Sequence, residues 1–304
     1  MIWWWILYVA AAEYLVILKP HSRVDVATNW IRSNFRQEPP PVKRQFTIGT
    51  ISGFVADFEP RGLSILSKCP EVLMIHDDTP VKQLEVVEQA PAPRHLARIS
   101  QRSSFSDEPG SAYRWDDDAS GQGVTVYVLD SGVNVDFDEF EGRAEVGANF
   151  TPESTDDANG HGTHVAGIVG SATYGVAKDV QITSVKVLDQ RGRGSLSTIF
   201  LGMEYAVNDM EAKGVPAVMN LSLGSVRSRA FNEVVNEVVK MGMVVVVAAG
   251  NEHINACLSS PASASGAITV GAIADSDDAL APFSNWGYCV DLFAPGVRVE
   301  TRGH

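Results

Sequence analysis

Residues 159–167 read Asn-Gly-His-Gly-Thr-His-Val-Ala-Gly and predict a histidine, His161, at the start of a helix of small and apolar residues. Gly160 allows a tight turn in front of His161, and the later glycines allow this helix to lie close to its neighbours. The two histidines also suggest a metal, but the helical zinc motif is H-E-x-x-H, and its glutamate and four-residue spacing are both absent. A plain structural helix is the alternative interpretation. Whether His161 has catalytic partners elsewhere in the chain decides between the two.

A candidate partner precedes the histidine. Residues 124–132 read Val-Thr-Val-Tyr-Val-Leu-Asp-Ser-Gly, an apolar run of strand length that ends in a carboxylate and a glycine turn. A carboxylate at the C-terminal end of a buried strand lies where doubly wound sheets keep their functional groups. Asp130 alone is also compatible with a turn or a helix cap. Because His161 follows 31 residues later, after one loop, a catalytic pair is favoured.

The two stretches together resemble the aspartate and histidine motifs of the subtilisin-like serine proteases, the subtilases, and most of all their proteinase K-like fungal branch. The resemblance extends from residue 13 to about residue 298. It implies a secreted endopeptidase that acts on peptides and proteins through an Asp-His-Ser triad, with broad specificity and apolar preferences. Asp130 and His161 are the residues that match. The resemblance also implies a monomer with no required cofactor.

Composition and charge are those of a soluble globular protein. The chain has 304 residues, of which 45% are hydrophobic and 20% charged, and this length suggests one large domain and a smaller one. The formal net charge of −13 argues against nucleic acid and anionic membrane surfaces as partners, because both would repel the chain.

Residues 1–12 are apolar and end in small residues, as the core of a signal peptide does. Twelve residues are too few to span a bilayer, which takes about 20. The segment lacks a basic leader, so a truncated or misread start is the alternative. A signal peptide here predicts an extracellular protein.

Residues 13–82 predict a small α+β domain in the order βαββαβ. The pattern indicates strands at 14–18 and 71–75, a helix at 27–35, two strands within 46–58 about Gly49 and Gly53, and a helix from Pro60. Taken alone, this scaffold is as typical of a binding or regulatory module as of anything else. In front of the two motifs it resembles the inhibitory propeptide of subtilases, which implies an intramolecular inhibitor and folding aid.

Residues 83–94 are polar and contain two prolines, which predicts a linker. In the family the propeptide is cut from the enzyme in such a segment. The match of residues 92–100 to the family's mature start places this junction near Val86 and Val87.

Residues 95–304 predict an α/β domain with a doubly wound parallel sheet, covered by helices on both faces and joined by right-handed crossovers. The resemblance makes it a subtilisin-like catalytic domain whose C-terminal part is missing. Besides the strand before Asp130 and the helix at His161, strands are expected at 182–188, 217–223, 243–248 and 267–270, and helices at 199–210 and 231–239.

Asn251 follows the most apolar of these strands. On chemistry alone it is equally well a turn former. In the family the matching asparagine donates a hydrogen bond to the oxyanion of the tetrahedral intermediate, and the resemblance gives Asn251 this role.

Two segments match the family's substrate-flanking strands, which pair with an extended peptide. They carry Gly194, Ser195 and Leu196, and Ser222, Leu223 and Gly224. As bare sequence both are ordinary loops. Ser225 stands where the family commonly has a second glycine, which changes the shape expected for the main specificity pocket.

Two of the three cysteines, Cys257 and Cys289, lie in the catalytic part, and Cys69 lies in the propeptide-like part. A pair in an exported domain is usually a disulfide, although two free thiols fit the spacing equally well.

Asp291, with the carbonyl groups of Ser265 and Ala267, matches a structural calcium site of proteinase K-like relatives. One carboxylate is few for an ion that takes 6 to 8 oxygen ligands.

The family continues after Ala-Pro-Gly at 294–296 to Gly-Thr-Ser-Met-Ala, where the nucleophilic serine begins a buried central helix. No Gly-Thr-Ser occurs in these 304 residues. We therefore expect a chain without the nucleophile, a truncated form of a true protease, in which apolar faces near His161 and the 243–248 strand are partly uncovered. The alternative is a catalytically dead relative, or a propeptide-bearing interaction protein whose partner covers that face.

Overall fold

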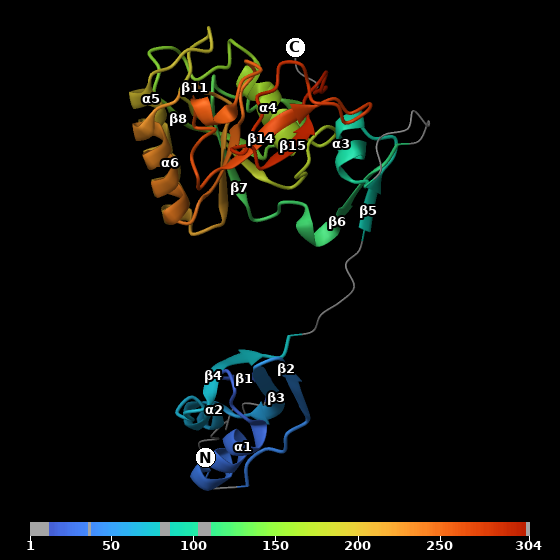
Figure 1. The fold of residues 1–304 in the computed structure, drawn as a ribbon, viewed down its shortest axis with the longest axis vertical. Helices are drawn as coiled ribbons and strands as arrows, with labels where there is room; N and C mark the ends of the chain where they lie inside the picture. Colours follow the sequence, from blue (N-terminus) through green and yellow to red (C-terminus); the bar gives the residue numbers. More distant parts are fainter. Residues whose placement is uncertain (1–11, 36–37, 80–85, 103–110, 302–304) are drawn as a thin grey trace, which may run out of the picture. The chain divides into compact units, whose positions relative to one another are not determined.

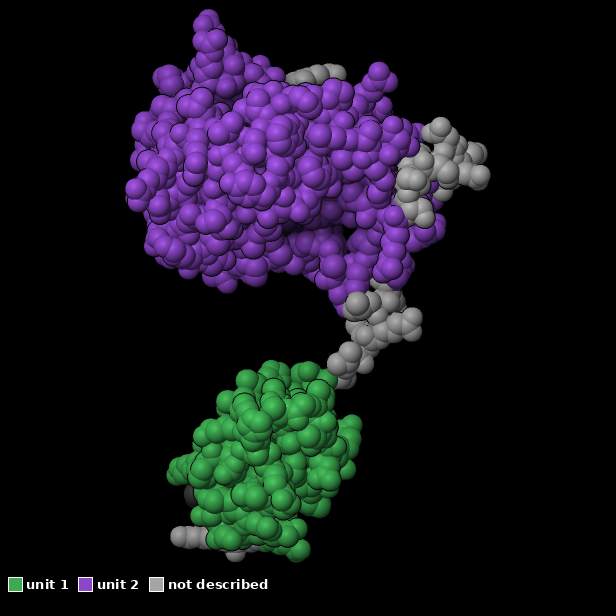
Figure 2. Space-filling view, viewed as in Figure 1, with its two compact units in different colours: residues 1–83 green, residues 84–304 purple. Residues whose placement is uncertain are grey.

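The computed structural model describes residues 12–35, 38–79, 86–102 and 111–301 (Figure 1). The chain divides into two compact units, residues 1–83 and residues 84–304 (Figure 2). The signal-peptide-like segment lies outside the described residues, except for Ala12, which begins the first strand. Among the helices that the structure describes, none is long and apolar enough to cross a membrane.

The first unit has the predicted order βαββαβ. Its antiparallel sheet has the strand order β2-β3-β1-β4, and alternate residues of β1 and β3, such as Val16 and Phe54, meet Ile31 of α1 and Leu66 of α2 in one core. Its elements are β1 (Ala12–Leu18), α1 (Val24–Asn34), β2 (Arg44–Ile48), β3 (Ile51–Phe58), α2 (Pro60–Leu66) and β4 (Val72–Asp77).

The turn between β2 and β3 differs from the prediction. The hairpin turns at Gly49, whose φ is +59°, a value that suits glycine, whereas Gly53 lies inside β3. A Cβ atom at Gly53 would collide with the ring of Phe46 on the neighbouring strand. Gly53 is therefore needed for close approach within the sheet and not for a turn.

The segment that was expected to be a linker contains regular structure. Strand β5 (Val86–Gln89) pairs antiparallel with β6 (Tyr113–Asp116), and helix α3 (Arg94–Ile99) follows. Val86 and Val87, where the processing junction is predicted, lie opposite Asp116 and Trp115 in this two-stranded ribbon. Sequence alone did not reveal this pairing, because each strand has only four residues.

The second unit is built on a seven-stranded sheet in which every pair is parallel, which confirms the predicted doubly wound α/β fold. The strand order is β15-β14-β12-β10-β7-β9-β8. The strands are β7 (Thr125–Asp130), β8 (Ala144–Asn149), β9 (Gln181–Lys186), β10 (Ala217–Leu221), β12 (Val244–Ala248), β14 (Ile268–Ile273) and β15 (Leu292–Pro295). Strands β8 and β15 were not predicted.

Among the described residues, helices α4 (His161–Gly170), α5 (Leu196–Lys213) and α6 (Arg229–Lys240) pack on the faces of this sheet, and α3 contacts its edge strand β15. Helices α5 and α6 pack on one face in a large apolar core, and α4 packs on the other face over β7 and β9. The ends of α5 are explained by its sequence, since a capping box of Ser195 and Thr198 begins it and Gly214 in the left-handed conformation ends it. The smaller elements are β11 (Ser225–Val226), β13 (Ser259–Ser260), and short 3-10 turns at 117–119, 138–140 and 256–258.

The face that carries α4 is covered unevenly. Val218 of β10 packs against the α4 core, but its neighbours further along the sheet are open to solvent. On this face Val244 of β12, Ile268 of β14 and Leu292 of β15 keep 46%, 39% and 46% of their surface exposed. The three residues lie on the same side of the sheet but not directly beside one another, because Ile268 pairs with Val246 and Leu292 pairs with Val270. Within the described part of the chain, half of one sheet face therefore lacks a full apolar cover.

Candidate active site

The centre of the site is a carboxylate and an imidazole that the fold brings together. Asp130 ends β7, is fully buried, and accepts a hydrogen bond of 2.7 Å from the backbone N–H of Ser131. Nδ1 of His161, at the start of α4, lies 2.8 Å from Oδ1 and 2.9 Å from Oδ2 of Asp130. Because an ionised carboxylate can only accept, Nδ1 donates and carries the ring hydrogen. The pair predicted from two distant motifs is thus in hydrogen-bond contact.

Glycines make this approach possible. Gly160 has a φ of +89°, which turns the chain into α4. A Cβ atom at Gly162 would collide with the carbonyl oxygen of Gly132, the turn residue that follows β7. The small residues of both motifs therefore bring the start of α4 within contact distance of the end of β7.

The imidazole is held in a field of negative charge. The hydrogen bond that Nδ1 donates to Asp130 raises the pKa of His161, burial opposes this shift, and the charges of Asp130 and Asp157 add to it. The side chain of His161 is half exposed, with 50% of its surface accessible, so Nε2 can reach a substrate. The site thus favours the protonated imidazole that forms when His161 takes a proton.

Asp157 anchors the start of α4, a function that the sequence analysis missed. Its carboxylate accepts hydrogen bonds from the N–H of Gly160 at 2.9 Å, and from both the N–H and the hydroxyl of Thr163 at 2.8 and 2.6 Å. Burial would raise the pKa of Asp157, but these bonds and the one from Ser131 hold it below its usual value. An aspartate just ahead of a predicted helix was the available signal.

A cavity of about 590 Å³ opens beside His161. It lies between the segments 192–194 and 222–225 and has an apolar lining from α5, α6 and the strand ends. Its lining residues are Asp130, Asn159, His161, Leu188, Gly192, Arg193, Gly194, Leu196, Ile199, Ser222, Leu223, Gly224, Ser225 and Phe231.

A second cavity of about 320 Å³ contains Asn251 and shares the segment 222–225 with the first. Within the described residues, no hydrogen bond engages the side chain of Asn251. Its loop is fixed by Asn285, which is fully buried, accepts from the N–H groups of Glu252 and Ile254, and donates to the carbonyl of Ala249. The segment 222–225 therefore lines both the cavity beside His161 and the cavity that contains Asn251. Hydrogen bonds to Asn285 fix the loop that carries Asn251.

One predicted substrate segment needs correction. Ser195 and Leu196 do not lie in an extended strand, because Ser195 caps α5 and Leu196 is its first residue. The hydroxyl of Ser195 accepts from the N–H of Thr198 at 3.2 Å. Gly194 and Leu196 still line the first cavity, as do Ser222, Leu223 and Gly224, but Ser195 does not.

The predicted disulfide is present between Cys257 and Cys289, whose Cα atoms are 5.4 Å apart, and Cys69 is free and buried in the first unit. Asp291 uses Oδ2 to accept from the N–H of Thr269 at 2.8 Å. No group of three or more His, Cys, Asp or Glu side chains suited to a metal occurs among the residues described. Nε2 of His164, the second histidine of the 159–167 stretch, lies 3.2 Å from the carbonyl oxygen of Val299.

The arrangement is suited to proton transfer. His161 has Nδ1 fixed by a carboxylate and Nε2 facing a cavity, which is the geometry of a general base. The pair of Asp130 and His161 is thus present. Among the described residues, no serine hydroxyl lies in hydrogen-bond contact with Nε2 of His161 for the pair to activate.

The sequence matches the Subtilase family model (Peptidase_S8) over residues 121–303. It is 36% identical to the subtilase-type proteinase RRT12 of Saccharomyces cerevisiae, over 97% of this chain and 68% of that protein. It is 42% identical to subtilisin-like protease 3 of Pseudogymnoascus destructans, over 84% of this chain and 63% of that protein. The chain thus spans about two thirds of the length of these relatives. The solved structure of a cold adapted subtilisin-like serine proteinase aligns with a TM-score of 0.62 and 40% identity, over 68% of this chain and 74% of that one.

Proposed function

The chain belongs to the subtilase family, and on this premise we propose that it carries the base and the oxyanion donor of a serine endopeptidase. The observation that carries the proposal is the 2.8 Å contact between Nδ1 of His161 and Oδ1 of Asp130. A carboxylate at Nδ1 holds the imidazole in the tautomer whose Nε2 can accept a proton. Peptides and proteins are the proposed substrates.

The reaction follows from these positions. Nε2 of His161 takes the proton of an attacking hydroxyl, whose oxygen adds to the peptide carbonyl carbon. The amide of Asn251, free of hydrogen bonds to described residues, donates to the oxyanion that forms. His161 then gives its proton to the leaving amine, and the acyl ester is hydrolysed by water with the same base. Asp130 stays ionised and stabilises the imidazolium.

We propose that the attacking serine lies on a helix that covers the open face of β12, β14 and β15. In the family, the Gly-Thr-Ser motif follows the segment that matches 294–296 and begins a buried central helix. The partial exposure of Val244, Ile268 and Leu292 supports a covering layer here, because strands of a parallel sheet are usually buried on both faces. A helix at that position would begin near His161 and Asn251.

The cavity beside His161 supports a preference for apolar side chains. Its deeper lining comes from Leu188, Leu196, Ile199 and Phe231. Residues 192–194 and 222–224 offer backbone groups on either side, so an extended peptide can pair with them as an added strand. Main-chain pairing gives affinity with little demand on sequence, which fits broad specificity.

We further propose that the first unit is an intramolecular inhibitor and folding aid, removed near Val87. Its own core and separate fold support this role, because it can stay folded until it is cut off. The disulfide between Cys257 and Cys289 supports a secreted, extracellular protein, since such bonds persist in oxidising compartments. A monomer is proposed from the family resemblance alone.

Calcium has no part in this proposal. The site expected at Asp291 offers one carboxylate and the backbone carbonyls of Ser265 and Ala267, and the carboxylate is already hydrogen-bonded to the backbone of Thr269. Calcium takes 6 to 8 oxygen ligands, so this donor set fits the ion poorly. A structural calcium ion stays a separate proposal, and no step of the reaction requires it.

Expression of two proteins tests the function: the 304-residue chain, and the product of the genomic reading frame that contains codon 304. We expect an in-frame Gly-Thr-Ser downstream, and a product that cuts itself near Val87, degrades casein and reacts with a fluorophosphonate. The change His161→Ala should abolish all three. The 304-residue chain should keep its full mass and leave casein intact.

Two results would contradict the proposal. A cleaved, casein-degrading 304-residue protein would show that the hydroxyl comes from within these residues. A reading frame without Gly-Thr-Ser, whose product is stable, monomeric and uncleaved, would favour a non-catalytic interaction protein, with a partner on the open sheet face.

A further inference from the structure

Lys186 is a buried cation beside the catalytic pair. Only 1% of its side chain is exposed, and it lies at the end of β9 in register with Asp130 of β7. The carboxylate paired with it, that of Glu153, is 3.8 Å from Nζ and partly exposed. A buried ammonium group costs free energy unless polar partners compensate it. The partners of Lys186 therefore show what this cation does.

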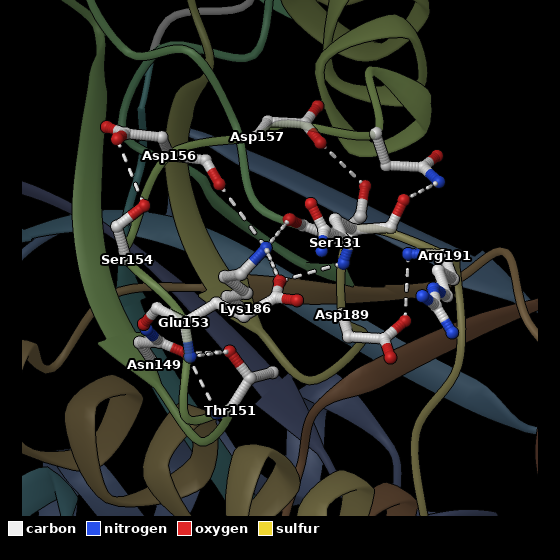
Figure 3. A network of polar contacts seen from close by, with 12 residues as sticks. Ser131, Asn149, Thr151, Glu153, Ser154, Asp156, Asp157, Lys186, Asp189 and Arg191 are labelled. Carbon is white, nitrogen blue, oxygen red and sulfur yellow. Dashed lines mark hydrogen bonds and ion pairs between the residues drawn. The ribbon is translucent and has the colours of Figure 1, made fainter.

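The ammonium group of Lys186 points towards Ser131 and Asp156, whose backbone carbonyls it contacts (Figure 3). It donates to the carbonyl oxygen of Ser131 and, at 3.3 Å, to that of Asp156. Ser131 in turn donates its N–H to Asp130 and its hydroxyl, at 2.8 Å, to Asp157. Lys186 thus fixes the residue that contacts both carboxylates.

The second carbonyl belongs to the loop that delivers Asp157. Asp156 precedes Asp157, and Asp157 holds the N–H of Gly160 and both polar groups of Thr163 at the start of α4. One ammonium group therefore joins the end of β7, which carries Asp130, to the loop that fixes the first turn of α4, which carries His161. The distance between the two catalytic side chains depends on both attachments.

The same cluster reaches the substrate side. Oε2 of Glu153 accepts from the N–H of Gln190 at 2.8 Å, and the side-chain amide of Asn159 donates to the carbonyl of Gln190 at 2.9 Å. Gln190 precedes the segment 192–194 that lines the cavity beside His161. The attachments of Lys186 thus extend from the catalytic pair to one wall of the cavity.

We propose that Lys186 is a positioning residue, which holds Asp130 and His161 in hydrogen-bond contact through the carbonyl oxygens of Ser131 and Asp156. The inference rests on the proposed function only in taking His161 as the base. If the lysine merely filled space, an unbranched apolar side chain would serve equally well. If its hydrogen bonds position the pair, the same change leaves the fold intact and loosens the contact between His161 and Asp130.

The test is Lys186→Met in the 304-residue chain, with Lys178→Met as the matched control. Lys178 is also partly buried and donates to backbone carbonyls, those of Ala172 and Gly175, but it has no contact with either catalytic residue. Methionine has nearly the volume of lysine, but the change leaves the carbonyl oxygens of Ser131 and Asp156 without this donor, so a urea unfolding curve first establishes that Lys186→Met is folded. The readouts are the pKa of His161 and its low-field Nδ1 proton signal, both by NMR.

In Lys186→Met we expect the Nδ1 proton signal of His161 to broaden. The looser contact with Asp130 lowers the pKa of His161, whereas loss of the nearby positive charge raises it, so the proton signal is the deciding readout. Lys178→Met should leave both unchanged. A folded Lys186→Met protein with the proton signal of the unaltered chain would overturn the proposal. No turnover is measured, so failure of the proposed protease activity would leave this result intact.

A second variant covers the case in which Lys186→Met does not fold. Glu153→Ala removes the carboxylate that links Lys186 to Gln190, and Glu145→Ala removes an exposed carboxylate that binds Lys213 instead. We expect a broadened Nδ1 proton signal in Glu153→Ala, weaker than a complete loss, and an unchanged signal in Glu145→Ala. An unchanged signal in both would overturn the proposal.

Discussion

Strands β7 and β12 lie in one parallel sheet, separated only by β10, and both are rich in valine, yet their surroundings differ. Every residue of β7 is buried, because α5 packs on one face and α4 on the other. In β12 only Val245 and Val247 are buried, beneath α6, while Val244 is 46% exposed on the opposite face. Similar sequences are thus fully covered in one place and half covered in the other.

This difference indicates what the described residues lack. A strand that alternates apolar and polar residues is suited to one solvated face, whereas β12 has five apolar residues in succession, as strands buried on both faces do. Its sequence therefore requires a cover on the face of Val244, Ile268 and Leu292. The proposed serine helix supplies that cover, and the contrast with β7 can be tested.

The largest expected effect compares His161 of α4, which is held by Asp130 at the end of β7, with Asn251, which follows β12. In the product of the complete reading frame, His161→Ala should lower kcat by about a millionfold and Asn251→Ala by about a hundred- to a thousandfold, figures taken from subtilisin itself. The base activates the nucleophile itself, whereas the amide stabilises only the charge that develops on the oxyanion. Steady-state hydrolysis of a peptide substrate measures both. Equal losses would argue against separate roles.

The next effect concerns stability. Val128→Asp, at a fully buried position of β7, should destabilise the second unit by more than about 4 kcal/mol, because it buries an unpaired charge. Val244→Asp, at the open position of β12, should cost less than about 1 kcal/mol. Urea unfolding of the 304-residue chain provides both values. A large loss in Val244→Asp would mean that this face is already covered.

Removal of the disulfide should have a smaller effect on the free energy of unfolding, in the part of the sheet that contains β12 and β15. The disulfide joins the loop after β12 to the segment before β15, across a sequence separation of 32 residues. Closing a loop of that length stabilises by roughly 3.5 to 4 kcal/mol on the chain-entropy model. The double variant Cys257→Ser, Cys289→Ser should lose about this amount in urea unfolding. Alkylation of both thiols in the non-reduced, denatured chain would instead show that the bond is absent.

The smallest expected effect is a pH dependence of the free energy of unfolding, which arises from Asp130 at the end of β7. Because Asp130 raises the pKa of His161 in the folded state, the stabilisation is complete below pH 6.5 and is lost as the pH rises through the folded-state pKa. Asp130→Asn should flatten this part of the profile. Urea midpoints from about pH 5 to about pH 9 measure it. The same slope in both proteins would show that Asp130 does not hold the imidazolium.

The sequence predicted the parts of the site that local signals carry. Asp130 and His161 were found because each lies in a long motif, and the disulfide was found because cysteine is rare. The resemblance predicts a strand at Ser195, whereas Ser and Thr at 195 and 198 form a capping-box pair, which is a helix signal. Long motifs were therefore reliable, whereas short signals such as Gly53 and the prolines of residues 83–94 predicted a turn and a linker where the structure has strands.

The remaining features depend on burial and on contacts between distant segments. Lys186 reads as one polar residue at a strand end, and only the fold shows that its ammonium group is enclosed by the carbonyls of Ser131 and Asp156. The role of Asn285 likewise needs the approach of two loops that are more than 30 residues apart in sequence. Strand β15 was missed because its four residues carry too little periodicity.

The most direct measurement is an NMR titration of His161 in the 304-residue chain, with and without Asp130→Asn. If Asp130 holds the imidazole as the base of an acyl-transfer site, His161 titrates above 6.5 in the unaltered chain, and its pKa falls in the variant. A His161 that titrates at the same pH in both proteins would contradict the account.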